Sequence, residues 1–277
     1  MKKGIVGKRI SRFAIYVVLI IITFIVAFPF VFMIFSSFKD IKEFYVTPPK
    51  LLPEQFKLDN YIELFSKGNF GRYYINSIFV TAIQVAGNLL VVLGAGYGFA
   101  KYDFKGKNQL FMLVLACTMV PWVATIIPLY IMANTFNVVD TYTGLIIPGL
   151  VDAMSIFLAR NFMTSIPTPL LEAARIDGAG EFKIFTKIVL PTVKPLIAVI
   201  SIQKLVGSWN AFQWPLLIVN SDDLRTLPVA IAKFSTQYYD AYDIKMAAAC
   251  VAIIPVLLLY IAFQKYFVEG ISLSGIK

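Results

Sequence analysis

The chain has 277 residues, of which 58% are hydrophobic and only 15% are charged, and its mean hydropathy is +0.75. These values lie outside the range of an ordinary soluble globular domain, so they exclude that class and predict an integral membrane protein. The net charge of +9 does not require a nucleic-acid partner, because basic loops beside membrane spans account for it.

Charge-free runs predict six membrane-spanning helices, because a helix needs about 20 apolar residues to cross a bilayer. The first run follows a basic start like that of a signal peptide, but it is longer and lacks a small-residue cleavage site, which predicts an uncleaved span. The runs are apolar on all sides and do not alternate, so barrel strands are not expected. We therefore predict an all-α integral membrane fold, a six-span helical bundle forming one domain over residues 1–277, with spans at about 13–35, 73–100, 109–134, 143–162, 195–219 and 246–267.

The distribution of Lys and Arg predicts how the bundle is oriented. An even number of spans places both termini on one side of the membrane. The termini, the turn at 101–107 and the segment 160–194 lie on that side and carry 15 basic residues, whereas the opposite loops carry nine, together with ten acidic residues. Because basic loops tend to stay in the cytoplasm, both termini are predicted to be cytoplasmic.

The first outer segment, residues 36–72, contains "TPPKLLPEQFKLDNYIELF". Its clustered prolines prevent a long helix, and Asp59 with Asn60 can cap a short one. The segment is either a solvated connector or a docking surface for an external partner, and the sequence leaves both interpretations open.

The cytoplasmic segment at about 165–191, between the fourth and fifth spans, is longer than a hydrophobic bundle needs. Thr168 before Pro169 predicts an N-cap and a helix start, and Leu170–Asp177 forms a helix that Gly178 ends. A second short helix is expected at about Glu181–Val189, stopped by Pro191, with Phe182, Phe185, Ile188 and Val189 on one side and Lys183 and Lys187 towards solvent. Two short helices joined at a glycine predict an elbow that transmits force to or from a soluble partner.

This segment resembles the EAA-x3-G-x9-I-x-L-P motif of the permease subunits of binding-protein-dependent ABC importers. All seven fixed positions match without a gap, namely Glu172, Ala173, Ala174, Gly178, Ile188, Leu190 and Pro191. The stretches Gly207–Ile231 and Phe263–Lys277 are similar to the carbohydrate-uptake branch of that family, which contains the smaller permease of maltose-type transporters. Glycerol-phosphate permeases share much of this pattern, so the sequence leaves glycerol phosphate open as an alternative cargo.

The resemblance implies a multi-pass subunit of the bacterial cell membrane that forms half of a translocation pore for a sugar or oligosaccharide. It implies three kinds of partner: a second permease, which makes a heterodimer, two ATPase subunits, and an extracytoplasmic solute-binding protein. The elbow would be a coupling helix, with Glu172 and Asp177 as candidates for charge contacts with the ATPase and Ala173 and Ala174 permitting close approach. The alternative for Glu172 is that it only caps or solvates a short helix.

The chain has no GxxxxGK[ST] phosphate loop, so it is not expected to hydrolyse ATP or to bind a cofactor itself. ATP and Mg²⁺ would be used by the partner ATPase.

Two charges inside predicted spans suggest a path for the cargo, because such charges usually face a cavity or a partner. Asp152 and Lys204 both lie roughly 15–20 Å from the cytoplasmic boundary, at 1.5 Å per helical residue, so they are expected to pair or to share a polar cavity. A structural pair and a substrate contact both remain open. Polar or flat side chains at similar depth can line the same path, namely Gln84, Asn88, Gln203, Trp209, Asn210, Gln213, Trp122 and Trp214.

Two other function classes fit the sequence less well. An ion-coupled secondary carrier with Asp152 as its titrating group would need no ATPase elbow. The absence of histidine argues against an intramembrane enzyme, because histidine is the commonest general base.

The two cysteines, Cys117 and Cys250, lie inside apolar runs and are expected to be packing residues, and no metal site is predicted.

Overall fold

The computed structural model describes residues 2–66, 69–237 and 241–274, and those residues form helices and no strand. Three of the helices are long and apolar enough to cross a membrane, and three pairs of bent helices pass the same test together, so this part of the chain offers up to six candidate spans. The predicted all-α integral membrane fold is confirmed. Met1 and residues 275–277, at the two ends predicted to be cytoplasmic, lie outside the described residues.

The chain divides into two compact units, Met1–Gly68 with Ile231–Ile254, and Asn69–Ala230 with Pro255–Lys277. The first unit contains α1 (Lys2–Ser36), η1 (Ile41–Tyr45) and α2 (Asp59–Ser66), most of α13 (Leu227–Gln237) and the beginning of α14 (Tyr242–Ser274). The predicted short helix is present, but Asp59 is its first residue and not its cap. Asn60 has a different task, because its buried amide donates to the carbonyls of Ser37 and Lys39 and ties α2 to the end of α1.

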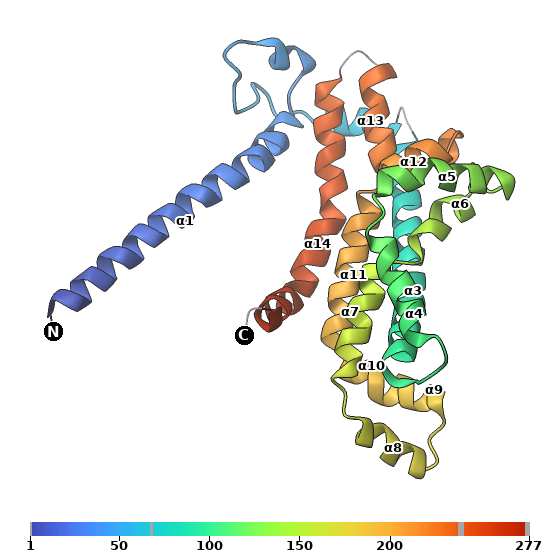
Figure 1. Cartoon of the computed structure of the whole chain (residues 1–277). Helices are drawn as coiled ribbons and strands as arrows, with labels where there is room; N and C mark the ends of the chain where they lie inside the picture. Colours follow the sequence, from blue (N-terminus) through green and yellow to red (C-terminus); the bar gives the residue numbers. More distant parts are fainter. Residues whose placement is uncertain (1, 67–68, 238–240, 275–277) are drawn as a thin grey trace. The chain divides into compact units, whose positions relative to one another are not determined.

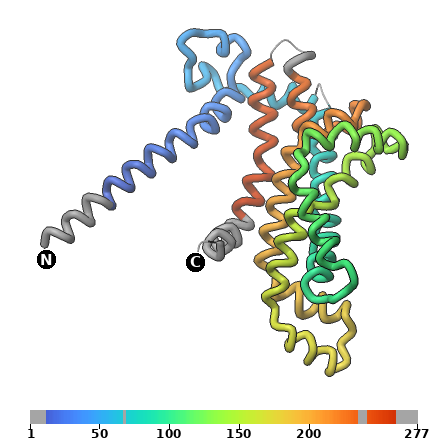
Figure 2. The backbone as a smooth tube through the Cα atoms, in the orientation of Figure 1, coloured from blue at the N-terminus to red at the C-terminus, as the bar shows by residue number. Residues whose placement is uncertain are grey.

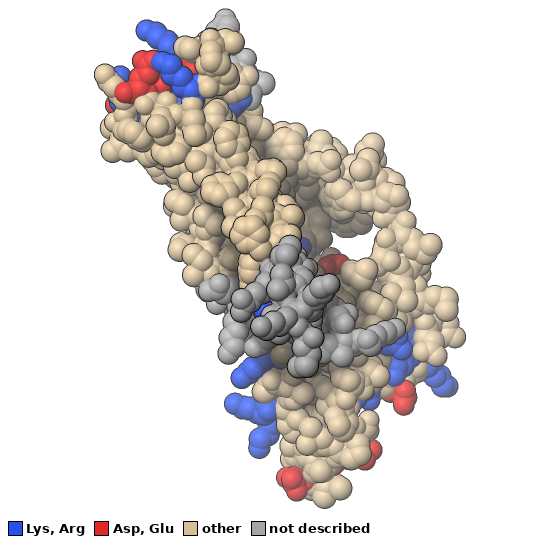
Figure 3. All heavy atoms as spheres, turned by 90° about the vertical axis from the view of Figure 1, so that its left-hand side faces the viewer, with Lys and Arg blue, Asp and Glu red and all other residues tan. Residues whose placement is uncertain are grey.

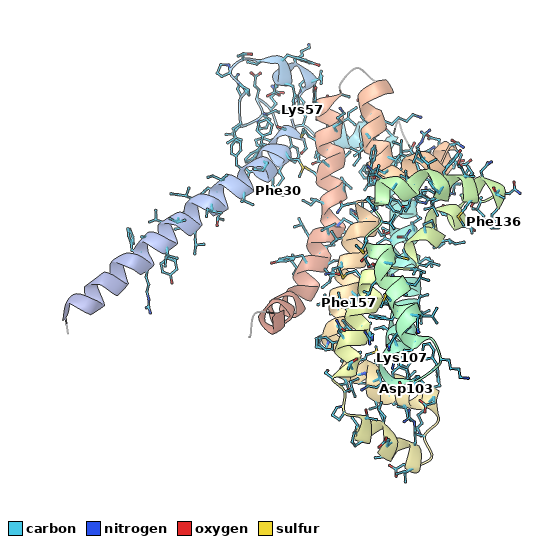
Figure 4. The ribbon with its side chains drawn as sticks, viewed as in Figure 1. Phe30, Lys57, Asp103, Lys107, Phe136 and Phe157 are labelled. Atoms are coloured by element: carbon cyan, nitrogen blue, oxygen red, sulfur yellow. The ribbon has the colours of Figure 1, made fainter. Side chains whose placement is uncertain are left out.

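The second unit is built around α3 (Phe70–Lys101), which lies beside α4 (Lys107–Thr118), α7 (Ala153–Thr164) and α11 (Lys194–Trp209) in Figure 1. The close approach of α3 to α7 depends on Gly96, since a Cβ built there would lie 2.5 Å from the Cβ of Ala159. Phe157, labelled on α7 in Figure 4, stacks on Phe111 of α4 with ring centroids 6.3 Å apart. These contacts pack α3 and α4 against α7.

The segment predicted as one span at 109–134 is instead two helices, α4 and α5 (Trp122–Thr135), which meet at an angle of 104°. The break lies at Met119–Pro121, where Pro121 has an extended conformation (ψ 135°). Proline disfavours helical geometry in the residue before it and lacks the N–H that would continue the helix. An apolar run therefore continues through a point where the helix cannot.

Two further predicted spans are also interrupted. At 143–162 the chain forms α6 (Tyr142–Ile146) and η2 (Ile147–Gly149), and these meet α7 at 43°. At 195–219 helix α11 ends at Trp209, and α12 (Gln213–Ile218) follows after a short break. Breaks of this kind are tolerated at membrane depth where neighbouring side chains bind the freed backbone groups.

Polar side chains hold the segment after α12 to the beginning of α3. The hydroxyl of Tyr73 donates to Asp222 of η4 (Asp222–Leu224) at 2.6 Å. The amide of Asn76 donates to the carbonyls of Asp223 and Arg225. Asp140 accepts from the backbone N–H of Ser221 and of Asn220, and these bonds lower the pKa of its carboxyl. This end of the second unit is therefore fixed by hydrogen bonds, not only by apolar packing.

Candidate functional site

The charged segment between α7 and α11 begins with α8 (Thr168–Ile176). The chain leaves α7, forms α8 and the next short helices beyond the end of α3, and returns in α11 (Figures 1 and 2). The N-cap is Pro167 and Thr168 is the first helical residue, one position from the prediction. Gly178 follows the helix with φ +79°, a left-handed conformation that glycine adopts without strain, and the chain turns there.

After the turn come α9 (Glu181–Ile184), a π-helical turn η3 (Phe185–Val189) and α10 (Leu190–Thr192). Pro191 does not stop this helix, contrary to the prediction. The N–H of Leu190 reaches back to the carbonyl of Phe185, the wide spacing of a π-turn, and the missing N–H of Pro191 is accommodated beside it. The bend of 80° comes after Thr192, where α11 begins.

The inner face of this segment packs into the main core of the second unit. Leu171, Ile184 and Val189 are fully or almost fully buried, against Met163 and Ile166 among others. Phe182, predicted on this packed face, is 80% exposed, and Ile184 takes that place with no exposed surface. The helix begins at Glu181 as predicted, but the wide π-turn at Phe185–Val189 shifts the packed face, so Ile184 and not Phe182 lies in line with Val189.

Glu181 is the centre of a polar cluster that the sequence alone did not predict. Its carboxylate accepts from the Nε of Arg175 at 2.6 Å, from the hydroxyl of Tyr102 at 2.5 Å and from the hydroxyl of Tyr97 at 3.2 Å. The hydrogen bonds from Arg175 and Tyr102 lower the pKa of Glu181 to about 2. Burial and the bond to Glu181 raise the pKa of Tyr102. The opposite charges on either side of Gly178 were the only sequence signal for this cluster.

The outer face of α8 carries the motif residues that the structure leaves exposed. Glu172, Ala173 and Asp177 are exposed and Ile176 is 85% exposed, whereas Ala174 is half-buried. Among the described residues neither Glu172 nor Asp177 has a side-chain hydrogen bond or an ion pair, so the capping role for Glu172 is not observed. Figure 3 shows charged side chains gathered at the lower end of the view, where α8 and α9 lie. This face combines unpaired carboxylates with exposed apolar surface.

The other motif positions lie on the helix that leads to α11. Ile188 and Leu190 are half-buried against the core, and Pro191 is exposed. They shape the joint between the elbow and α11 and do not contribute to the exposed face of α8.

Gln84 and Asn88, predicted along the cargo path, are buried and hold the interrupted helix in place. The amide of Gln84 donates to the carbonyl of Leu145 at 2.9 Å, and that of Asn88 donates to the carbonyl of Leu150 at 3.2 Å. Both carbonyls lie at the break between α6 and α7, where backbone acceptors need other donors. These two side chains therefore serve the fold.

Asp152 lies at the break before α7 and not within a continuous helix. One carboxylate oxygen accepts from the N–H of Met154 at 3.0 Å and the other from the hydroxyl of Ser155 at 2.6 Å, so Asp152 is the N-cap of α7. Lys204 of α11 is half-buried and is attracted by the Asp152 carboxylate. Within the described residues no carboxylate lies within the 4.0 Å of an ion pair from Lys204.

The remaining predicted path residues do not form one surface. Asn210 and Gln213 are exposed beside the break between α11 and α12, and the amide of Asn210 donates to Val206 of its own helix. Trp209 is buried edge-on to the ring of Tyr74, and Trp214 is buried with its indole N–H bound to the carbonyl of Gly144. Trp122 is 44% exposed and Gln203 is exposed, so these two are accessible as well as Asn210 and Gln213.

A cavity of about 340 Å³ lies within the second unit, but its lining does not suit a hydroxyl-rich solute. The one hydroxyl contributed by α11, that of Ser201, donates to Ile197 of its own helix. The lining is otherwise apolar except for the phenol of Tyr260, and consists of Val85, Ser201, Ile202, Leu205, Val206, Val256, Leu259 and Tyr260. Among the described residues no three His, Cys, Asp or Glu side chains gather into a possible metal site.

Gly149 gives a first prediction. A Cβ at this position would lie 2.3 to 2.5 Å from the amide atoms of Gln84. Gly149→Ala is expected to push Gln84 away and leave the carbonyl of Leu145 unpaired, at a cost of about 1–3 kcal/mol. Thermal unfolding of the detergent-solubilised protein measures this cost. In a Gln84→Ala background the same change should cost much less, and equal costs in both backgrounds would contradict the explanation.

Glu181 gives a second prediction, on pH. Its pKa falls from the ordinary value of 4.5 to about 2, so the charged form stabilises the folded protein fully above pH 4.5, and this stabilisation is lost as the pH falls towards 2. The difference in Tm between the wild type and Glu181→Gln should be constant between pH of about 5 and 8 and shrink below pH 4.5. A difference that stays constant down to the lowest usable pH would contradict the assigned charge.

A model of the family described as binding-protein-dependent transport system inner membrane component matches residues 90–273. The chain is 37% identical over 259 residues to the arabinooligosaccharides transport system permease protein of Halalkalibacterium halodurans, covering 92% of this chain and 93% of the relative. It is 32% identical over 263 residues to the diacetylchitobiose uptake system permease protein of Streptomyces coelicolor, covering 93% and 86%.

The fold is similar to that of a solved chain from a bacterial ABC transporter involved in the import of the acidic polysaccharide alginate. The TM-score is 0.85 with 24% sequence identity, and the match covers 94% of this chain and 98% of that one. The likeness in fold therefore covers nearly the whole chain.

Proposed function

The chain belongs to the family of binding-protein-dependent transport system inner membrane components, and on that premise we propose that it is a permease subunit of an ATP-driven importer. It forms half of a translocation pore for an oligosaccharide. The observation that carries the cargo class is the near full-length similarity to permeases named for arabinooligosaccharide and diacetylchitobiose transport. Neither the glycerol-phosphate alternative nor an ion-coupled carrier has comparable support.

The exposed face of α8 is the docking surface for a separate ATPase subunit. Glu172 and Asp177 offer unpaired carboxylates, Ala173 permits close approach, and Ile176 offers an apolar contact at the centre of the face. Interfaces of this kind combine a buried apolar anchor with charges that choose the partner. The chain itself has no phosphate loop, so ATP and Mg²⁺ act in the partner subunits.

The pore is completed by a second permease, in a heterodimer, and an extracytoplasmic solute-binding protein delivers the cargo. The outer segment that includes η1 and α2 is the proposed docking surface for that binding protein, with both termini on the cytoplasmic side. Asp152, Lys204, Trp209, Asn210 and Gln213 remain the proposed path residues. Gln84 and Asn88 contribute by fixing the broken helix beside that path.

Co-purification tests the proposal. The tagged chain, isolated from its native membrane, is expected to bring with it an ATPase and a second permease. Cells that lack the gene should lose uptake of at least one of radiolabelled arabinotriose, raffinose and diacetylchitobiose. A chain that purifies alone and drives uptake with an ion gradient would overturn the proposal.

A further inference from the structure

The carboxylate of Glu181 joins three elements, α9, α8 and the end of α3. Arg175 supplies the bond to α8, and the hydroxyls of Tyr97 and Tyr102 supply the bonds to α3 and to the residue directly after it. Hydrogen bonds to a charged acceptor are shorter and roughly twice as strong as those between neutral groups. The elbow is therefore tied to α3 by its strongest polar contacts and not only by its chain connections.

Two neighbouring contacts hold the same joint. The ammonium of Lys101, in the last turn of α3, donates to the carbonyls of Thr164 and Ile166, where the chain leaves α7 for α8. The ring of Tyr97 lies 5.2 Å from that of Phe185 and 5.5 Å from that of Tyr102, measured between centroids. The end of α3 thus contacts the elbow where the chain enters it and where it leaves.

The connection from the elbow to α11 has a different character. It runs through the π-turn at Phe185–Val189 and then bends by 80°. By contrast α3 is one unbroken helix of 32 residues, and at Gly96 it is in close contact with α7. When α8 is displaced, the chain leading to α11 can bend at the π-turn. The continuous helix α3 can instead move as a rigid body with α8.

We propose that Tyr97 and Tyr102 are positioning residues that couple the elbow to α3 through Glu181, so that movement of α8 by the partner is passed to α3 and not to α11 alone. This inference rests on the proposed function. According to this inference, two tyrosines outside the EAA motif determine which helix moves with α8.

The test uses Tyr97→Phe combined with Tyr102→Phe in the purified transporter complex. This double variant keeps the rings and the Arg175–Glu181 ion pair and removes only the two hydroxyls. Spin labels are placed at Gly94→Cys on α3 and, separately, at Gly207→Cys on α11, in a Cys117→Ser, Cys250→Ser background. An added side chain at either glycine has nothing within 4 Å. Label mobility and accessibility are compared without nucleotide and after trapping with ATP and vanadate.

The nucleotide-dependent change at the α3 label is expected to fall about fivefold in the double variant, while the change at the α11 label is retained. A charge swap, Arg175→Glu with Glu181→Arg, restores the bond between α8 and α9 but leaves the tyrosines without an acceptor, so it should behave like the double variant. Tyr130→Phe is the matched control. Tyr130 of α5 is partly buried, and its hydroxyl makes no hydrogen bond among the described residues.

The other outcomes overturn the inference. An unchanged response at the α3 label, or full recovery in the charge swap, would mean that the tyrosines do not carry the movement. Loss of the response at both labels, or loss of the ATPase from the complex, would mean that the cluster only maintains the docking helix. A wild-type chain that purifies without an ATPase would instead overturn the proposed function, and this inference with it.

Discussion

Replacing Gly96 with valine is expected to destabilise the second unit by about 3 kcal/mol and to lower its Tm by roughly 6–12 °C. A Cβ at Gly96 would lie 2.5 Å from the Cβ of Ala159 and 3.0 Å from its carbonyl carbon. The atoms that it would meet are the methyl group and the backbone of Ala159, and neither can rotate away. The valine side chain therefore forces α3 and α7 apart. Separation would also disrupt the core that supports the elbow, and the amount of protein in the membrane is expected to fall.

Gly94→Val is the matched control, since it makes the same change two residues away on the same helix. An added side chain at Gly94 has nothing within 4 Å. Thermal unfolding of both variants in detergent measures the difference. If Gly94→Val lowered Tm as much as Gly96→Val, the cost would come from valine in the helix and not from the contact between α3 and α7.

The sequence predicts the class of fold because hydrophobic length and charge distribution decide it. It places α3 within three residues at each end, since the run 73–100 has no internal proline. It does not predict the break at Met119–Pro121, because proline within apolar runs is common in membrane helices and its effect depends on the neighbours. α5 contains Pro128 without a break, which illustrates the same difficulty.

The candidate site divides in the same way. The motif spacing locates α8 and the turn at Gly178, because both depend on local sequence. The Glu181 cluster joins residues up to 84 positions apart, and the contact of Gln84 with Leu145 spans 61 positions. Such pairs are decided by how helices pack. Polar residues in a membrane helix are equally compatible with lining a path and with binding a broken backbone, so the sequence could not separate those roles for Gln84 and Asn88.

Glu172→Lys is expected to reduce oligosaccharide uptake about a hundredfold and to release the ATPase during purification, while the chain still inserts and folds. The side chain is exposed and has no partner among the described residues, so its loss removes nothing from the fold. Reversing a charge that is buried in an interface costs about 2–5 kcal/mol, and each 1.4 kcal/mol corresponds to about tenfold in affinity. Co-purification and uptake of radiolabelled arabinotriose, raffinose and diacetylchitobiose measure the two effects.

Asp103→Lys is the matched control, since it makes the same change of charge on an exposed residue in the turn between α3 and α4, near the elbow in Figure 4. It breaks only a surface ion pair with Lys107, whose nitrogen lies 3.1 Å away, and such pairs contribute about 0–1 kcal/mol. If both variants kept the ATPase, the face of α8 would not be the docking surface. If both variants lost the ATPase, binding would depend on the net charge of the surface around the elbow and not on a specific contact of Glu172. Only loss in Glu172→Lys alone locates the contact on α8.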